Sequence, residues 1–323
     1  MTETAVKYIY RFREGNASMR DLLGGKGANL AEMARLGLPV PPGFTITTDT
    51  CRAYYDSGRS APEGLWEDVK SHLAEVEEGV GRRFGDAANP LLVSVRSGSK
   101  FSMPGMMDTI LNLGLNDETV KGFAQSTGDE RFALDSYRRF ISLFSKVALG
   151  VKGEHFDAVL SEAKSRNGAA TDADLSTEAL TEVVRRYLEI VEREAGEPFP
   201  QDPWKQLRMA VLAVFDSWNS ERAIAYRDYS RIPHDLGTAA NIMAMVFGNS
   251  GWDSGTGVCF TRDPSTGENV LYGEYLKNAQ GEDVVAGVRT PEKIAELKEE
   301  MPAVYDELFG IGQQLEQHFR ERQ

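Results

Sequence analysis

The sequence has little cysteine, little histidine and no long apolar run. Cys51 and Cys259 are the two cysteines among 323 residues, too far apart in sequence to indicate a metal-ligand pair or a disulfide framework. No histidine has another histidine or a cysteine at metal-ligand spacing, and none lies in a small-residue loop suited to a phosphorylated nucleophile. We therefore identify no metal ligands and interpret all four histidines as structural or surface groups: His72, His155, His234 and His318.

The lack of a membrane span, of a signal peptide and of a positive net charge restricts where the protein can be located and what it can bind. No window approaches the roughly 18 apolar residues of a membrane span, and the first residues contain no apolar signal core. A formal net charge of −13 disfavours nucleic acid and anionic membranes as partners. We expect a cytoplasmic protein of two or three lobes. An acidic chain that binds a polyphosphate must build a local positive pocket, so basic residues near glycines or strand ends are the informative ones.

The most informative segment covers residues 92–109. A short β-branched run leads to Arg96, which we expect at a strand end, and a loop with Pro104, Gly105 and a pair of methionines follows. A guanidinium can bind two phosphate oxygens at once, and glycine allows the backbone to approach them. The segment therefore predicts a phosphoryl-transfer site.

A second glycine-rich segment, residues 24–27, carries Lys26 and precedes a helix. Backbone N–H groups at a helix start, with an ammonium group beside them, can bind an anion. The segment is not a Walker A loop, because no Ser or Thr follows the lysine. Alone such a segment is more often a plain turn; together with Arg96 it favours an anion site.

Periodicity predicts both strands and helices. We expect strands at residues 6–12, 44–48, 91–95, 242–247, 257–260 and 270–275. We expect helices at residues 28–36, from 49 with Asp49 as cap, at 131–149, at 177–191 after a Ser176 cap, at 204–228, and from Thr290-Pro291 to the end. Residues 164–174 are small and polar and indicate an exposed connector.

Polar residues after the predicted strand at 270–275 are candidates for contacts with ribose hydroxyls or a lysine. They are Glu274, Gln280, Glu282 and Asp283. Solvated surface groups are the alternative interpretation, and the residues alone favour that alternative.

Several long motifs together resemble the pyruvate, phosphate dikinase family very closely. They are residues 16–27, residues 91–112 with Gly-Met-Met-Asp-Thr at 105–109, Thr-Arg-Asp-Pro-Ser-Thr-Gly-Glu at 261–268, and residues 272–290. The resemblance runs from about residue 6 to the last residue. It implies an α+β fold, an ATP-grasp-like two-lobed nucleotide-binding domain with a helical insertion. The implied parts are residues 1–115 with 198–240 as the first lobe, 116–197 as the insertion, and 241–323 as the second lobe.

The resemblance also implies a reaction. The family converts ATP, phosphate and pyruvate to AMP, pyrophosphate and phosphoenolpyruvate, with Mg²⁺. A histidine on a mobile domain attacks the β-phosphorus of ATP, and the phosphohistidine then reaches a barrel where pyruvate is phosphorylated. Positioning and charge stabilisation would carry the chemistry. ATP, the phosphohistidine domain and the pyruvate-binding barrel are therefore the implied partners.

The resemblance assigns roles to individual residues. Lys26 and Arg96 match the lysine and the essential arginine that act on the ATP phosphates, and Gly105 to Thr109 match the phosphate-side loop. The run with Met243, Met245 and Val246 matches the strand whose backbone holds the adenine edge; relatives often carry glutamine at Met243, so the backbone contact is the implied one. Gln280 and Glu282 complete the set, with Glu282 the candidate for the ribose hydroxyls.

The sequence departs from the family pattern at its end. Two strands with Mg²⁺-holding carboxylates and a phosphate-side glutamine follow soon after the segment that matches residues 318–320, whereas this sequence stops at Gln323. We expect a truncated fragment that binds ATP but is inactive alone. Two alternatives stay open: a stand-alone nucleotide-binding or docking protein without catalysis, and a relative that uses water or a glucan in place of phosphate and pyruvate.

Overall fold

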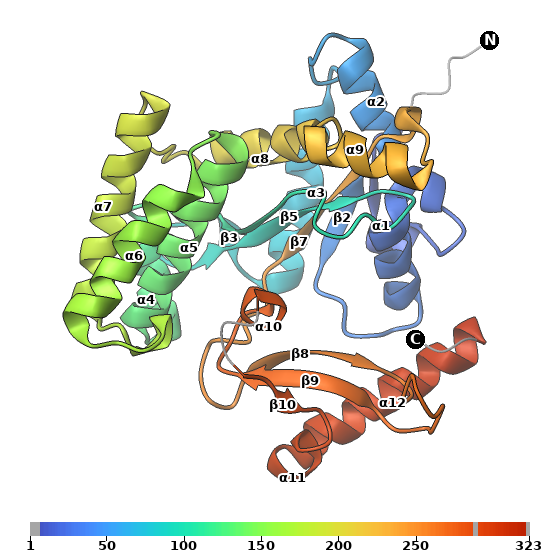
Figure 1. Ribbon diagram of the computed structural model, residues 1–323. Coiled ribbons are helices and arrows are strands. Elements are labelled where there is room, and N and C mark those ends of the chain that lie inside the picture. Colours follow the sequence, from blue (N-terminus) through green and yellow to red (C-terminus); the bar gives the residue numbers. More distant parts are fainter. Residues whose placement is uncertain (1–6, 287–289, 321–323) are drawn as a thin grey trace. The chain divides into compact units, whose positions relative to one another are not determined.

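The computed structural model describes residues 7–286 and 290–320 of the chain (Figure 1). Two compact units divide after Met245, namely Met1–Met245 and Val246–Gln323. Both combine helices with antiparallel sheet, which confirms the mixed helix-and-sheet class predicted from the sequence. No helix among the described residues is long and apolar enough to cross a membrane.

The first unit is built on a five-stranded antiparallel sheet with the strand order β1-β2-β7-β5-β6. Its strands are β1 (Ile9–Arg11), β2 (Gly43–Ile46), β5 (Val93–Gly98), β6 (Thr109–Leu113) and β7 (Ala239–Ala244). Every residue of the central β7 is buried, and β5 is buried except at Arg96. Strands buried on both faces need continuous apolar or small residues, which explains the β-branched run before Arg96.

Helices cover this sheet and connect its strands. They are α1 (Arg20–Arg35), α2 (Thr48–Asp56), α3 (Leu65–Val80), α8 (Pro203–Ser217) and α9 (Glu221–Ser230), with short 3₁₀ turns η1 (Phe12–Glu14) and η3 (His234–Leu236). A small parallel pair, β3 (Arg83–Phe84) with β4 (Pro90–Leu91), precedes β5. The helix α1 contacts β2, β5 and β7, whereas α8 contacts β5, β6 and β7.

Four helices between β6 and α8 form a helical block, which Figure 1 shows in green and yellow. They are α4 (Thr119–Thr127), α5 (Glu130–Ala148), α6 (Gly153–Asn167) and α7 (Thr177–Ala195), with the 3₁₀ turn η2 (Asp172–Asp174) before α7. The predicted helices at 131–149 and 177–191 are confirmed as α5 and α7. The Ser176 cap is also confirmed, because its hydroxyl accepts a hydrogen bond from the Ala179 amide at 3.2 Å.

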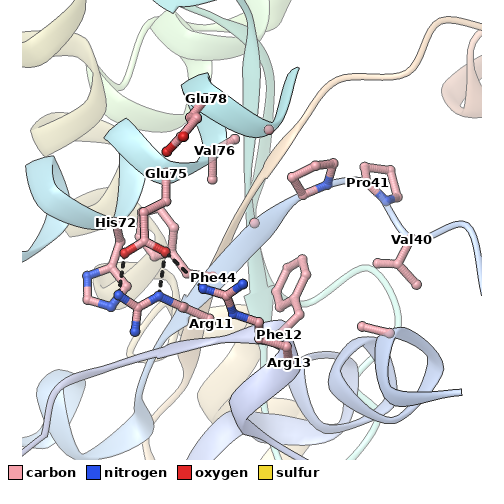
Figure 2. A pocket seen from close by; sticks show the side chains of 14 residues that line it. Arg11, Phe12, Arg13, Val40, Pro41, Phe44, His72, Glu75, Val76 and Glu78 are labelled. Carbon is pink, nitrogen blue, oxygen red and sulfur yellow. Dashed lines mark hydrogen bonds and ion pairs between the residues drawn. The ribbon is translucent and has the colours of Figure 1, made fainter. Parts of the chain in front are cut away.

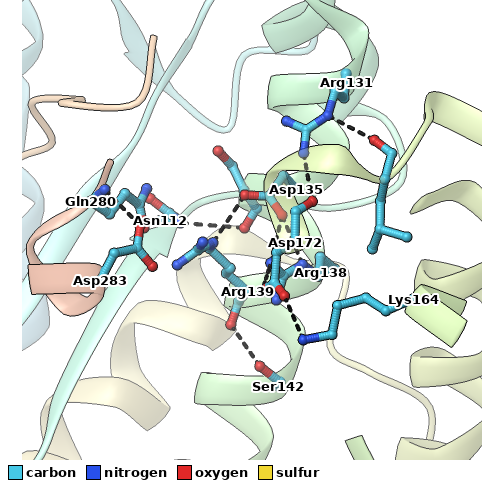
Figure 3. Close-up of polar contacts among 12 residues, drawn as sticks. Asn112, Arg131, Asp135, Arg138, Arg139, Ser142, Lys164, Asp172, Gln280 and Asp283 are labelled. Atoms are coloured by element: carbon cyan, nitrogen blue, oxygen red, sulfur yellow. Dashed lines mark hydrogen bonds and ion pairs between the residues drawn. The ribbon is translucent and has the colours of Figure 1, made fainter. Parts of the chain in front are cut away.

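A buried ion-pair network joins α5 to the connector before α7 (Figure 3). Asp135 and Arg138 are almost fully buried, and the Arg138 guanidinium lies 2.7 Å from the carboxylates of both Asp135 and Asp172. Arg139 binds the second Asp135 oxygen at 3.0 Å, and Lys164 lies 3.2 Å from Asp172. Residues 164–174 are exposed or half-buried, as predicted for a connector, but they are less irregular than predicted because α6 continues to Asn167.

The second unit contains a three-stranded antiparallel sheet with the order β10-β9-β8. Its elements are β8 (Gly255–Phe260), β9 (Tyr272–Lys277), α10 (Gly281–Ala286), β10 (Glu292–Lys293), α11 (Leu297–Glu300) and α12 (Pro302–Phe319). Leu271, Tyr275, Ile294 and Leu297 form its buried core. Arg262 binds the Glu316 carboxylate through Nε and Nη2, at 2.9 Å each, and so fixes α12 to the end of β8.

Three sequence predictions are wrong at the level of local structure. Asp49 pairs with Arg52 instead of capping α2, whose cap is Thr47. The single helix predicted at 204–228 is two helices, because the Ser220 hydroxyl caps a new helix start. Thr290-Pro291 does not begin a helix: the next two residues pair with β9 as β10.

Two strand predictions have shifted bounds. The strand predicted at 242–247 is β7 at Ala239–Ala244, so Val246 lies beyond it. The strand predicted at 91–95 continues past Arg96 to Gly98, which places Arg96 within the strand instead of at its end.

The ion-pair network should make stability depend on Asp135. Arg138 and Arg139 hold the pKa of this buried carboxyl below its ordinary value of 3.8, against the opposing effect of burial. Asp135→Asn leaves two arginines facing a neutral amide, and we expect it to lower the free energy of unfolding by about 3–5 kcal/mol at pH 7 in urea titrations.

The sign of the pH effect follows from the direction of the shift. A depressed folded-state pKa stabilises the protein above the unfolded-state value and is lost as pH falls through the folded-state value. The difference between wild type and Asp135→Asn should therefore shrink from pH 7 to about pH 3. Asp306→Asn, at an exposed position on α12, is the control; a constant difference would contradict the assignment.

Candidate functional site

Four polar residues form one row across the sheet of the first unit. Thr45 lies opposite Asn241, Asn241 opposite Arg96, and Arg96 opposite Thr109, on β2, β7, β5 and β6 in turn. Directly opposite residues point to the same face of a sheet. This face is covered by α1, because a Cβ atom on Gly27 would lie 2.8 Å from the Asn241 Oδ1 atom.

Asn241 joins three strands through its fully buried side chain. Its Oδ1 atom accepts a hydrogen bond from the Thr45 hydroxyl at 2.8 Å, and its Nδ2 atom donates to the Arg96 carbonyl at 3.3 Å. A buried amide with both ends bonded is held in one orientation. Asn241 therefore fixes the backbone that carries Arg96.

The glycines of residues 24–27 allow α1 to approach β5 closely. Gly24 has φ +68° and ψ 172°, a conformation essentially restricted to glycine, and its Cβ position would lie 1.9 Å from the Gly98 carbonyl oxygen. The next amide, Gly25 N–H, donates to the Ser99 carbonyl at 2.8 Å. Gly24 has non-helical backbone angles and separates two helical segments within α1; the glycine segment therefore opens a helix as predicted, although this helix begins before residue 28 and a short helical segment from Arg20 precedes it.

This approach brings the cations Lys26 and Arg96 together. Lys26 retains contact with solvent, yet the protein around it removes enough water to lower the pKa of its ammonium group, and the nearby Arg96 lowers that pKa further. Neither side chain has a hydrogen-bond or ion-pair partner among the described residues. Two adjacent cations without a carboxylate form a place where an anion gains the attraction of both charges.

A cavity of about 400 Å³ opens beside Lys26. It lies between the start of α1 and the loop after β5. Of the predicted site residues, Lys26 and Gly105 line it, whereas Arg96 and Thr109 do not. Other lining residues, to which the sequence analysis gave no individual role, are Arg20, Asn29, Ser97, Ser99, Lys100, Ser102, Met103 and Met107. Lys100 is held by Asp21 at 2.5 Å. Arg20 and Lys100 could have been recognised from the sequence, because Arg20 lies shortly before the glycines of residues 24–27 and Lys100 lies within residues 92–109.

Gly105 provides a backbone turn at the edge of this cavity. Its φ is +72°, and a Cβ atom there would meet nothing within 4 Å. Glycine is therefore needed for the conformation and not for space. Thr109 begins β6 directly opposite Arg96, so both ends of the predicted phosphate-side loop lie near the two cations.

The predicted adenine run leaves the sheet in its second half. Met243 is 7% exposed and is flanked by Gly43 on β2 and Ser94 on β5. The amides of Ala244 and Met245 donate to the carbonyls of Pro42 and Leu92, at 2.9 Å each. Val246 is 72% exposed and begins the second unit.

Gln280 and Glu282 belong to the second unit. Gln280 is 4% exposed, and neither polar atom of its side chain has a hydrogen-bond partner among the described residues. Buried amides without partners are rare in folded proteins, so Gln280 is suited to a polar ligand. The side chain of Glu282 lies outside the described residues, and its predicted ribose contact stays a prediction.

The histidines are engaged elsewhere. His72 Nδ1 bonds the Asp68 carbonyl at 2.8 Å, and His155 lies 3.7 Å from Glu194. His234 bridges Arg227 and Asp228, and His318 stacks edge-on against Phe319. No three histidine, cysteine, aspartate or glutamate side chains converge on a metal-binding point within the described residues.

A second cavity, of about 530 Å³, is larger but is not lined by any of the predicted site residues. Figure 2 shows its wall, where Arg11 from β1 and Glu75 from α3 face each other; the Arg11 Nε atom lies 2.6 Å from the Glu75 carboxylate. Arg11 and Arg13 are already neutralised by Glu75, whereas Lys26 has no carboxylate partner among the described residues. The smaller cavity is therefore the better candidate for binding an anion.

Known proteins match the chain along almost its entire length. It matches the family described as "Pyruvate phosphate dikinase, AMP/ATP-binding domain" over residues 20–62 and 61–315. It is 54% identical to a pyruvate, phosphate dikinase of Clostridium symbiosum over 98% of this chain and 36% of the relative. Relatives from rice (Oryza sativa subsp. japonica, chloroplastic) and Rhizobium meliloti are each 53% identical over 98% of this chain, and it covers 34% and 37% of them. The chain thus spans about a third of the length of these relatives.

The close approach at Gly24 should be intolerant of any side chain. We expect Gly24→Ala to lower the free energy of unfolding by about 3 kcal/mol or more, because it adds backbone strain and a collision with a carbonyl that cannot move. Gly25→Ala is the matched control, since its Cβ atom would make only an ordinary 3.4 Å contact with the Ser99 carbonyl. Equal stability of the two variants in chemical denaturation would contradict the predicted contact.

The coupling of Lys26 to Arg96 should be visible in a titration. Arg96→Met removes a neighbouring positive charge, so the pKa of Lys26 should rise toward its ordinary value of 10.5 while partial desolvation keeps it below that value. Lysine side-chain NMR across alkaline pH measures the shift. Arg208→Met, on α8, serves as the charge control, and a Lys26 pKa unchanged in Arg96→Met would show that the cations are not adjacent.

Proposed function

This chain belongs to the pyruvate phosphate dikinase AMP/ATP-binding domain family, and from that premise we propose that it binds ATP at the cavity beside Lys26. The observation that supports this most is the adjacency of Lys26 and Arg96, two cations without carboxylate partners among the described residues in a chain of net charge −13. Such a pair is costly unless an anion binds there. A polyphosphate supplies several oxygens for both cations at once.

The phosphates would lie between α1 and the loop after β5. Lys26 and Arg96 would bind phosphate oxygens directly, and the backbone from Gly105 to Thr109 would approach the outer phosphates. Positioning and charge stabilisation by fixed cations are the main contributions that a protein makes to phosphoryl transfer. The fixed backbone of Arg96, bonded to Asn241, means that little reorganisation is needed when the anion arrives.

We assign the adenine edge to the run containing Met243, Met245 and Val246, with the backbone of this run as the contact. Gln280 and Glu282 would meet the ribose hydroxyls. This assignment presupposes an ATP-grasp-like arrangement, in which residues 1–115 with 198–240 form one lobe, 116–197 the helical insertion and 241–323 the other lobe.

In the whole protein, this part would supply ATP to a reaction with phosphate and pyruvate that yields AMP, pyrophosphate and phosphoenolpyruvate. The phosphate-accepting histidine and the pyruvate-binding barrel would be other parts of that protein. None of the four histidines is among the residues that line the cavity. We therefore expect the chain alone to bind ATP without turnover.

Magnesium would accompany ATP as its counter-ion. Among the described residues, no group of three His, Cys, Asp or Glu side chains is placed to hold a metal ion. A reducing compartment such as the cytoplasm fits both cysteines, which are free, and burial raises the pKa of the Cys51 thiol to about 12.

Binding can be measured by isothermal titration of the chain with ATP, AMP and pyrophosphate. We expect ATP and pyrophosphate to bind, and Lys26→Met and Arg96→Met each to raise the Kd for ATP by roughly 10- to 100-fold, as for the loss of a charge-assisted hydrogen bond. AMP should be affected less, because it lacks the outer phosphates.

Lys121→Met is the matched control, since it removes an exposed lysine of the helical block that pairs only with Glu118. If the chain binds no nucleotide, or if Lys26→Met and Lys121→Met bind ATP equally well, the proposed site is wrong.

A further inference from the structure

One arginine outside the predicted site holds the phosphate-side loop from a distant helix. Arg222 lies in the first turn of α9, more than a hundred residues after the loop in sequence. Its Nε atom donates to the Met106 carbonyl at 3.1 Å, and its Nη2 atom pairs with the Asp108 carboxylate. One planar guanidinium thus binds two points of the loop that are two residues apart.

Further contacts fix the same loop. The Asp108 amide donates to the Ser217 hydroxyl at 3.4 Å, and that hydroxyl donates to the Val214 carbonyl of α8 at 2.7 Å. The Asp108 carbonyl accepts from the Ser97 amide on β5 at 3.4 Å. Below the loop, Met103 is buried against Trp218.

The ion pair itself contributes little to global stability. The Arg222 side chain is 51% exposed and that of Asp108 24% exposed, and pairs this accessible to solvent are weak. Its effect is geometric instead. Gly105 has φ +72°, and the Met106 amide donates to the Met103 carbonyl at 3.1 Å across this turn, so Arg222 holds the part of the loop that follows it.

We propose that Arg222 is a positioning residue that holds residues 103–108 in the conformation that receives the outer phosphates of ATP. It acts through the Met106 carbonyl and the Asp108 carboxylate and does not touch the ligand. This inference rests on the proposed function, since it assigns the loop to phosphate binding. It predicts that Arg222 matters for ATP and not for AMP.

The test compares wild type with Arg222→Met, Asp108→Asn and the double variant, all as the full chain. Isothermal titration with ATP and AMP gives the affinities, and amide hydrogen exchange at Met106 and Asp108 without nucleotide reports the loop. Arg231→Met is the control, because it removes the same charge at the other end of α9 and its side chain contacts no described residue through a hydrogen bond or ion pair.

Arg222→Met should raise the Kd for ATP by about tenfold, change that for AMP by less than about twofold, and accelerate exchange at Met106 and Asp108. The double variant should bind ATP no more weakly than the weaker single variant, because both substitutions remove the same contact between Arg222 and Asp108. Arg222→Lys, which can replace one of the two contacts, should lie between wild type and Arg222→Met.

Three results would overturn the proposal. Additive losses in the double variant would mean that Arg222 binds phosphate directly. Equal losses of affinity for ATP and AMP in Arg222→Met would indicate general destabilisation. Unchanged hydrogen exchange at the Met106 and Asp108 amides would show that Arg222 does not hold the loop. If wild type does not bind ATP, the proposed function fails, and the exchange data alone still decide whether Arg222 holds the loop.

Discussion

The close approach of α1 to the end of β5 is the constraint on which the rest of the site depends. No side chain fits where Gly24 faces the Gly98 carbonyl, and the contact exists because position 24 is glycine. It places Lys26 beside Arg96 and forms one wall of the cavity. A bulkier residue would separate helix from strand, and the two cations would then be solvated independently. Backbone sterics therefore set the electrostatics of the site.

The charge at the candidate site is positive, although the net charge of the chain is negative. A protein with a net charge of −13 would ordinarily neutralise its arginines, as the network around Asp135 and the Arg11–Glu75 pair do. At Lys26 and Arg96 the neutralising carboxylates are missing among the described residues. Cations without carboxylate partners are expected at a binding site, where the ligand supplies the neutralising charge. The contrast between paired and unpaired cations identifies the site better than the size of the cavities does.

The sequence could predict features that are encoded locally. Ser176 is followed by an amphipathic period, and both cap and helix α7 form as expected. Predictions failed where a local signal competed with another. Ser220 interrupts the apolar period from residue 204 and starts a new helix, and the Thr290-Pro291 signal precedes two residues that are used instead to extend the sheet beside β9. Pairing with a strand that is distant in sequence cannot be recognised from the few neighbouring residues that indicate a helix start.

The site residues also divide into those that a local motif indicates and those that depend on residues distant in sequence. Lys26 and Arg96 could be recognised because each lies in a distinctive short motif, whereas Asn241 and Arg222 act on residues 145 and 114 positions away. The helical block lies within that separation. Loop closure costs rise only logarithmically with length, so a block that packs on itself through α5 and α7 can be inserted at small entropic cost. Its insertion keeps the site intact only if the chain returns through α8, α9 and β7 in the correct register. Asn241 and Arg222, on that returning segment, are therefore the residues that convert two local motifs into one site.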